Sequence, residues 1–139
     1  MVAGMTPPTV KGGFVSAILS AGFHVELAGG GHYSPDAVRA KVTEIQGKIP
    51  PGVGITLNSL YLNPRQFVFQ LPLWQQVRKE GLPIEGFCVA AGIPSTEKAA
   101  EIIEGLASAD VMLVVLVKAQ RLLVDSKVCP IMFFPTCVT

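Results

Sequence analysis

The stretch that decides the fold is HVELAGGGHYSPDAV, which occupies residues 24–38. Residues 24–28 form an apolar run that predicts a β-strand, and Gly29-Gly30-Gly31 ends it. Ser34 followed by Pro35 is typical of a helix N-cap with proline at the first helical position. We therefore expect a helix over residues 35–46, with an apolar stripe formed by Val38, Val42 and Ile45.

The same strand-then-helix unit recurs along the chain. Further strands are expected at residues 2–5, 53–58 and 84–89. Further helices are expected at residues 9–20, 73–80 and 96–107. Because the connections are short, the strands should be parallel and joined by right-handed crossovers.

Units of this kind are typical of a TIM (β/α)8 barrel or of a doubly wound sheet. The chain lacks a GxGxxG fingerprint, which disfavours a doubly wound dinucleotide-binding domain. A closed barrel needs about 250 residues, whereas this chain has 139. We therefore predict an α/β fold that is a partial TIM (β/α)8 barrel, containing its first four to five βα units.

The C-terminal part differs in character, because its strand ends carry no glycines and its helices no cap signals. Residues 111–117 predict a fifth strand, residues 118–127 a short helix and residues 128–134 another apolar run. We divide the chain into residues 1–107, the N-terminal half of a barrel, and residues 108–139, a divergent tail. That tail is either one more strand–helix unit or unrelated sequence.

The composition is unusually apolar, with 50% hydrophobic and 15% charged residues. Such a balance indicates a piece from the buried interior of a larger protein; the alternative is a single very apolar domain. The net charge of +1 and the absence of a basic stripe exclude an obvious nucleic-acid surface. No apolar run approaches the ~20 residues that span a membrane. The three cysteines have no metal-site spacing, so we expect no metal and reduced thiols in a cytoplasmic protein.

The candidate site lies where the predicted strands end, because parallel strands of a barrel present their carboxyl ends at one face. These ends carry small or polar residues: Gly4, Met5, Thr6, Gly30, Gly31, Asn58, Ala90 and Ala91. Small side chains let a flat ligand approach the backbone amides. The alternative is that the glycines serve only tight turns, which is our interpretation for Gly4 taken alone.

Individual polar residues at these ends allow two interpretations each. His32 is either a structural residue or a group that exchanges protons near neutral pH, whereas His24, at the start of its strand, is interpreted as structural. Asn58 either holds the polar edge of a cofactor ring or forms an Asx turn. Glu26 belongs either to an ion pair inside the barrel or to the surface. Cys88, within a strand, is expected to be inert.

Several stretches resemble one family. They are VAGMTP at residues 2–7, ELAGGGHY at 26–33, IPPGVGITLNSLY at 49–61, NPRQF at 63–67 and GFCVAAGIP at 86–94. The chain resembles, over about residues 1–106, the enoyl reductase domain of the β subunit of fungal-type fatty acid synthase.

The resemblance implies a TIM barrel that binds FMN and uses NADPH to reduce an enoyl thioester carried on acyl carrier protein. It also implies partners, namely the rest of the β subunit and the α subunit of a multifunctional complex. By resemblance, the strand-end residues above would hold the flavin, and His32 would donate a proton or contact the nicotinamide. The flavin would carry the redox chemistry, and the protein would orient it.

The resemblance ends near residue 106, and residues 108–139 do not follow the family's later strands and phosphate site. Either the clone or reading frame is truncated and continues into unrelated sequence, which we favour, or the chain is a genuine short relative. We expect the isolated chain to hold FMN weakly or not at all. Two alternatives stay open: a non-catalytic module that pairs through an open sheet edge, and a relative of nitronate-oxidising flavoenzymes.

Overall fold

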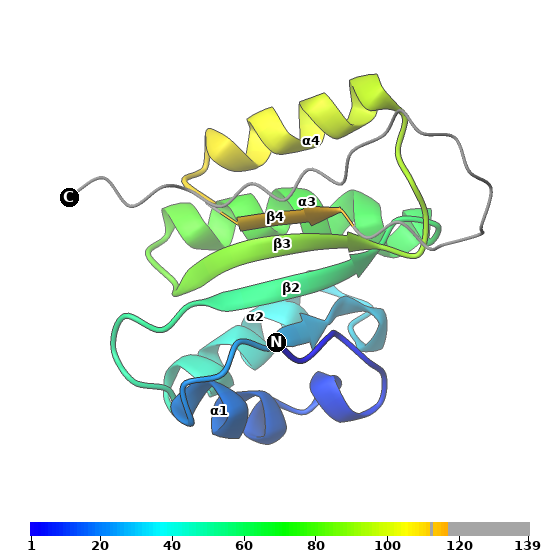
Figure 1. The fold of residues 1–139 in the computed structure, drawn as a ribbon. Helices are drawn as coiled ribbons and strands as arrows, with labels where there is room; N and C mark the ends of the chain where they lie inside the picture. Colours follow the sequence, from blue (N-terminus) through cyan, green and yellow to red (C-terminus); the bar gives the residue numbers. More distant parts are fainter. Residues whose placement is uncertain (112, 117–139) are drawn as a thin grey trace.

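The computed structural model describes residues 1–111 and 113–116. Its centre is a parallel sheet with the strand order β1-β2-β3-β4 (Figure 1). The strands are β1 (Glu26–Ala28), β2 (Ile55–Leu60), β3 (Ile84–Ala90) and β4 (Leu113–Leu116). Strands that follow each other in the chain are also neighbours in the sheet, which is the arrangement expected of repeated βα units.

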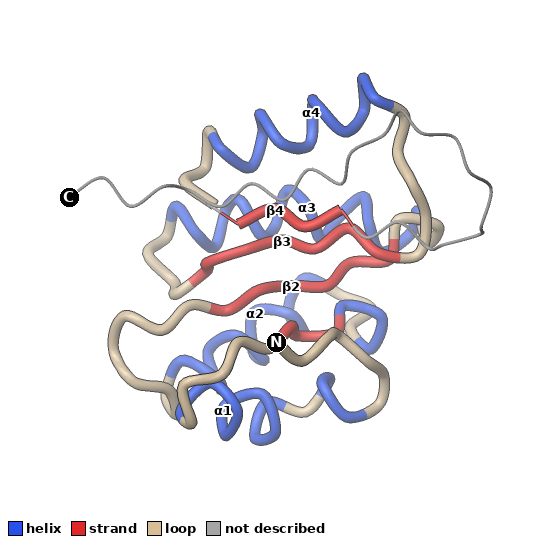
Figure 2. The backbone as a smooth tube through the Cα atoms, in the orientation of Figure 1, coloured by secondary structure: helices blue, strands red, loops and turns tan. Residues whose placement is uncertain are grey.

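Helices connect the successive strands, as Figure 2 shows. They are α2 (Pro35–Gln46), α3 (Pro64–Lys79) and α4 (Thr96–Ala107), while α1 (Gly12–Ser20) precedes β1. In Figure 1, α2 and α3 lie behind the sheet, while α1 and α4 lie at its two ends. Each parallel pair of strands needs such a crossover because a tight turn cannot return the chain to the same end of the sheet.

Side chains alternate along the strands between a helix-covered face and an opposite face. Phe87 of β3 lies on the helix-covered face, since its ring packs edge-on against Phe67 of α3 with centroids 6.1 Å apart. Leu27, Leu57 and Phe87 are aligned in register and fully buried. Trp74 of α3 is also buried, and its indole nitrogen donates to the carbonyl of Gly86 over 2.7 Å. This layer is the hydrophobic core.

The sequence predicts α2 and α4 with the bounds that the structure shows. Both begin at a serine N-cap. Ser34 Oγ accepts from the backbone nitrogen of Ala37, and Ser95 Oγ accepts from that of Lys98, each over 3.2 Å. Local capping chemistry therefore fixes both helix starts, which explains why sequence alone locates them.

The first unit differs from its prediction. Instead of a strand at residues 2–5, the structure has a single parallel bridge between Val2 and Val25. The expected helix from residue 9 is a 3₁₀ helix over Pro8–Val10, and α1 begins only at Gly12. The reason is a local ring: Thr9 Oγ1 accepts from the Met5 nitrogen over 2.6 Å and donates to the Met5 carbonyl over 2.8 Å.

The third helix is longer than predicted. We expect it to start at residue 73, after Pro72, but α3 begins at Pro64 and includes Pro72. A proline inside a helix leaves the carbonyl four residues earlier without its helical partner. That residue is Val68, which is 72% exposed. Water can therefore satisfy the carbonyl, and the helix continues through the proline.

The structure supports a partial α/β fold, and the closed TIM barrel stays a prediction. The fifth strand predicted at residues 111–117 appears as β4, which pairs with β3. The predicted helix at residues 118–127 and the apolar run at 128–134 lie outside the described residues. Among the described residues, no helix has the length and apolarity to span a membrane.

Candidate functional site

The parallel strands bring four segments to one edge of the sheet, which we call the carboxyl edge. Gly4 follows the Val2–Val25 bridge, the glycine turn (Gly29–Gly31) follows β1, Asn58 lies in β2, and Ala90 ends β3. The sequence predicts Asn58 as the last residue of its strand, which is wrong, because β2 continues to Leu60. The roles of these segments toward a cofactor stay predictions.

A buried carboxylate links three of these segments. Glu26 of β1 is 2% exposed, and its Oε2 accepts from the backbone nitrogen of Gly4 over 2.9 Å and from Asn58 Nδ2 over 2.7 Å. Asn58 Nδ2 also lies 3.5 Å from Cys88 Sγ. Glu26 is thus neither of the two options left open by the sequence, because its described partners are neutral donors inside the protein.

Cys88 is a buried free thiol beside this carboxylate. Burial raises the pKa of the Cys88 thiol well above its usual range, and the charge of Glu26 raises the pKa further. The thiol therefore stays protonated and is a poor nucleophile. This agrees with the expectation that Cys88 is inert; Cys129 and Cys137 lie outside the described residues.

Two glutamines of α3 hold the glycine turn from the helix side. Gln70 Nε2 donates to the carbonyl of Gly29 over 2.8 Å, and Gln66 Nε2 donates to that of His32 over 3.1 Å. Ser59 Oγ in turn donates to Gln70 Oε1 over 2.7 Å. Sequence reasoning misses both glutamines. Their spacing of four on one helix face is the only local signal, and the partner turn is distant in the chain.

The glycines of this edge are tightly packed against the chain itself. A Cβ at Gly31 would lie 2.5 Å from both methyl carbons of Val10, and one at Gly4 would lie 2.5 Å from Asn58 Cβ. At Gly30 the nearest atoms would be Leu60 Cδ1 at 3.1 Å and Thr6 Oγ1 at 3.5 Å. Close internal contact is therefore sufficient reason for glycine at Gly4 and Gly31, while Gly30 has more room.

His32 follows the glycine turn and is buried, with 4% of its surface exposed. Within the described residues, its Nε2 has no hydrogen-bond partner. Burial lowers the pKa of the imidazole, and the positive charge of Lys41 lowers the pKa further. The ring is therefore neutral at neutral pH, with one buried nitrogen free to bind a ligand or exchange a proton.

His24 lies at the opposite edge of the sheet, just before β1. Its Nδ1 lies 3.8 Å from Glu85 Oε2, although its Nε2 is buried without a partner among the described residues. The interpretation of His24 as structural fits this position, because in βα folds catalytic groups gather at the carboxyl edge.

The end of β3 has an unusual backbone. Ala91 has a φ of 53°, in the left-handed region that side chains other than glycine seldom adopt. The carbonyls of Ala90 and Ala91 accept from the backbone nitrogens of Tyr61 over 2.7 Å and Leu62 over 3.1 Å. These bonds extend the pairing of β2 with β3 into the loops and hold the strained residue in place.

Large apolar side chains are exposed after the ends of successive strands. Met5, Tyr33, Leu62 and Ile93 are each more than half exposed, and Thr6 is also exposed. Each follows one of the segments that converge at the carboxyl edge. The edge thus combines buried polar groups with an apolar rim, as ligand sites do.

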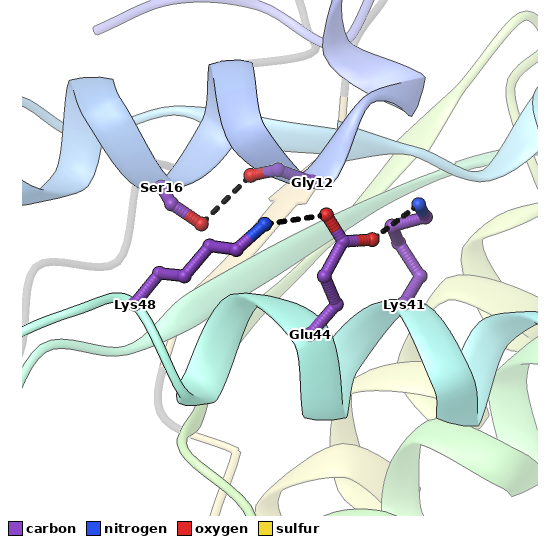
Figure 3. Close-up of polar contacts among 5 residues, drawn as sticks. All are labelled: Gly12, Ser16, Lys41, Glu44 and Lys48. Atoms are coloured by element: carbon purple, nitrogen blue, oxygen red, sulfur yellow. Dashed lines mark hydrogen bonds and ion pairs between the residues drawn. The ribbon is translucent and has the colours of Figure 1, made fainter.

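Lys41, which influences His32, belongs to a cluster between α2 and α1 (Figure 3). Glu44 Oε2 lies 2.5 Å from Lys41 Nζ, and Glu44 Oε1 lies 2.8 Å from Lys48 Nζ. Hydrogen bonds from the two lysines lower the pKa of Glu44 to about 2. A Cβ at Gly12 would lie 2.7 Å from this carboxylate, so glycine lets α1 approach α2.

A separate cavity of about 260 Å³ opens at the amino edge, where the strands begin. Its lining includes Gly54, Arg78, Glu85 and Asp110. Arg78 Nη2 pairs with Asp110 Oδ2 over 2.8 Å, which satisfies the charges of both side chains. Among the described residues, no group of three or more histidine, cysteine or acidic side chains could hold a metal ion.

Comparison with known proteins identifies close relatives. No model of a protein family matches the chain. It is 55% identical over 109 residues to fatty acid synthase 2 of Mycosarcoma maydis. It is 50% identical over 105 residues to the fatty acid synthase subunit beta of Schizosaccharomyces pombe, and 50% identical over 106 residues to the fatty acid synthase beta subunit pigK of Monascus ruber.

These matches cover 76–78% of this chain but only 3–5% of each relative. The chain thus corresponds to a small segment of much longer proteins. These relatives are fungal fatty acid synthases, mostly β subunits, which is the family that the sequence resembles.

Proposed function

From this kinship with fatty acid synthase β subunits, we propose that the chain is a segment of their enoyl reductase. The complete enzyme would use NADPH and FMN to reduce an enoyl thioester carried on acyl carrier protein. The described units would be the first of a TIM barrel, completed by the rest of the β subunit and assembled with the α subunit in the cytoplasm.

The observation that carries this proposal is the contact between Gly4 and Asn58. The resemblance assigns both residues to the flavin site, although they lie far apart in the chain. In the structure the backbone of Gly4 packs against the Asn58 side chain, and Glu26 accepts a hydrogen bond from each. This contact supports the proposal, because it brings two separately assigned residues together near the carboxyl edge.

The described residues fit a flavin in part. Gly30 leaves the backbone approachable beside Thr6, and the buried Nε2 of His32 lacks a partner. Gly4, Met5, Thr6, Gly30, Gly31, Asn58, Ala90 and Ala91 would hold the ring. When bound, FMN would supply hydride transfer from NADPH to the β-carbon of the enoyl thioester.

His32 would act on the proton in this reaction. Its Nε2 would donate to the α-carbon of the substrate, or would contact the nicotinamide. Because burial and Lys41 keep the imidazole neutral, it would give up the proton of an N–H and be restored from solvent. Its carbonyl is fixed by Gln66 and Gln70, which would hold the residue in place during this transfer.

Flavin binding by the purified chain tests the proposal. FMN titration followed by fluorescence quenching should show weak binding, because the chain supplies only part of the site. Asn58→Leu should weaken that binding further, and Arg78→Ala, at the amino edge, should leave it unchanged. A stoichiometric yellow complex would contradict the weak binding expected of a partial site. An equal loss of FMN affinity in both variants would contradict the location of the site at the carboxyl edge.

The role of His32 is tested in the complete parent domain. His32→Ala should abolish most enoyl reduction while flavin content stays normal, and His24→Ala should preserve activity. Retained enoyl reduction with normal flavin in His32→Ala would remove His32 from the mechanism.

A second function has support from the sheet, in which β1 and β4 are the outermost strands among the described residues and only a single bridge, from Val2 to Val25, adjoins β1. Such outermost strands can pair with another chain. The chain would then be a non-catalytic assembly module. Light scattering discriminates between the two functions: a discrete dimer that does not bind FMN would favour the module, and a monomer that binds FMN would favour the reductase segment.

A further inference from the structure

Glu26 has no role in the function proposed above, yet it is the most buried carboxylate among the described residues. Its Oε2 receives two neutral donors, the Gly4 nitrogen at 2.9 Å and Asn58 Nδ2 at 2.7 Å. Gly4 comes from the N-terminal segment and Asn58 from β2. One oxygen atom therefore ties together the two segments that meet at the carboxyl edge.

This contact determines which end of the Asn58 amide faces inward. A carboxylate oxygen only accepts hydrogen bonds, whereas an asparagine offers a donating nitrogen and an accepting oxygen. The nitrogen must face Glu26, because the opposite orientation would bring two acceptors together. Within the described residues, no hydrogen bond reaches the remaining atom, Asn58 Oδ1.

We propose that Glu26 is a positioning residue that orients Asn58 so that the site presents an acceptor, and so selects ligands with an N–H on the ring edge. Naming the ligand rests on the proposed function: the oxidised isoalloxazine ring of FMN has one ring N–H, at N3. A ring methylated at N3 keeps its shape and stacking surface but loses that donor.

The experiment compares FMN with 3-methyl-FMN on the full chain, by titration followed in ¹⁵N-labelled protein. Wild-type protein should bind FMN about tenfold more tightly than 3-methyl-FMN, as expected for the loss of one hydrogen bond. Glu26→Met keeps the length of the side chain but removes the acceptor, and should reduce this preference to about twofold or less. Glu26→Gln keeps an acceptor oxygen and should retain the preference.

Glu85→Met is the matched control, because Glu85 is a half-exposed glutamate at the opposite end of β3. It should leave the preference at the wild-type value. Loss of preference in Glu85→Met as well would mean that any disturbance of the sheet has this effect, and would overturn the positioning role.

The outcomes separate this inference from the proposed function. If wild-type protein binds both flavins equally, FMN binding stands and the inference fails. If Glu26→Met weakens both flavins by the same factor and keeps the preference, Glu26 is merely structural and the inference also fails.

If neither flavin binds the wild-type chain, its partial site is too weak for this comparison, and the ligand-free spectra decide the inference. The side-chain amide signals of Asn58 should then shift and exchange faster with water in Glu26→Met; unchanged signals would overturn it. Should Glu26→Met not fold, the exchanged pair Glu26→Gln with Asn58→Asp replaces it. In that pair the amide of Gln at position 26 donates to the carboxylate of Asp at position 58, whose other oxygen is presented to the ligand. The preference for FMN over 3-methyl-FMN should therefore persist, and its loss would overturn the inference.

Discussion

The two edges of the sheet differ in how their polar and charged groups find partners. At the amino edge, the charged groups pair with one another near solvent, as Arg78 does with Asp110. At the carboxyl edge, the polar groups are buried, and Glu26 and Asn58 bind each other while His32 Nε2 has no described partner. The amino edge is thus built from weak exposed pairs, and the carboxyl edge from buried groups that are costly to leave unsatisfied.

This difference indicates where function lies. A fold gains little from burying an imidazole nitrogen without a partner or from holding Ala91 in a left-handed conformation. His24 Nε2 at the amino edge is also buried without a described partner, but the carboxyl edge combines such a nitrogen, on His32, with the left-handed Ala91 and the exposed apolar rim. The amino edge has a cavity of about 260 Å³, but Arg78 and Asp110 in its lining are already paired with each other.

The largest expected effect comes from Asn58→Asp, which places a second carboxylate against Glu26. The free energy of unfolding should fall by about 3 kcal/mol or more, because the new charge is buried without a donor. Arg78→Ala, which breaks the exposed pair of the amino edge, should cost at most about 1 kcal/mol. Urea unfolding measures both.

Adding Glu26→Gln to Asn58→Asp should recover most of that loss, since one carboxylate and one amide again face each other. Equal costs for Asn58→Asp and Arg78→Ala would remove the distinction between the edges.

A smaller effect is expected at the glycine turn. Gly31→Ala brings a methyl group within 2.5 Å of Val10 and should destabilise the protein by about 1–3 kcal/mol. Val10→Ala in the same chain should relieve much of this. Gly13→Ala in α1 meets no atom within 4 Å and should instead stabilise by about 0.5–1 kcal/mol. If thermal unfolding shows that both substitutions change the stability in the same direction, packing against Val10 does not explain why glycine occupies position 31.

The pH dependence of stability should show the smallest effect. Because the pKa of folded His32 is lowered from 6.5, the unfolded chain takes up its proton first as the pH falls. The free energy of unfolding should therefore decrease as the pH falls through 6.5 and level off below the folded pKa. His32→Gln should flatten this slope.

Lys41→Met should flatten the slope in part, since the charge of Lys41 is the second cause of the lowered pKa. Lys41 also pairs with Glu44, which titrates in a separate pH range. The stabilisation of the fold by the Glu44 carboxylate is present above pH 4.5 and is lost as the pH falls toward about 2. An unchanged slope near pH 6.5 in His32→Gln would show that His32 does not titrate as its burial requires.

Features set by neighbouring residues are predictable from the sequence. Ser34 and Ser95 bind backbone nitrogens three residues ahead, so α2 and α4 begin where expected. The meeting of Gly4 with Asn58 is only partly predictable. The sequence places both at strand ends, whereas Gly4 follows a single bridge and Asn58 lies inside β2.

Other features are not predictable in this way. The missing first strand and the early start of α3 are local, but the Met5–Thr9 ring and a helix that continues through Pro72 leave no signature in the apolar periodicity. The sequence leaves Glu26 undecided because both of its partners lie on other segments. Gln66 and Gln70 are missed for the same reason, since their acceptors belong to the glycine turn.

The most direct test of the account is a map of FMN binding on the ¹⁵N-labelled chain, with the ligand at about millimolar concentration to reach weak sites. Backbone signals of Gly4, Thr6, Gly30, Asn58 and Ala91 should shift together, while those of Gly54, Arg78 and Asp110 stay in place. Shifts confined to these amino-edge residues would contradict the assignment of the carboxyl edge as the flavin site.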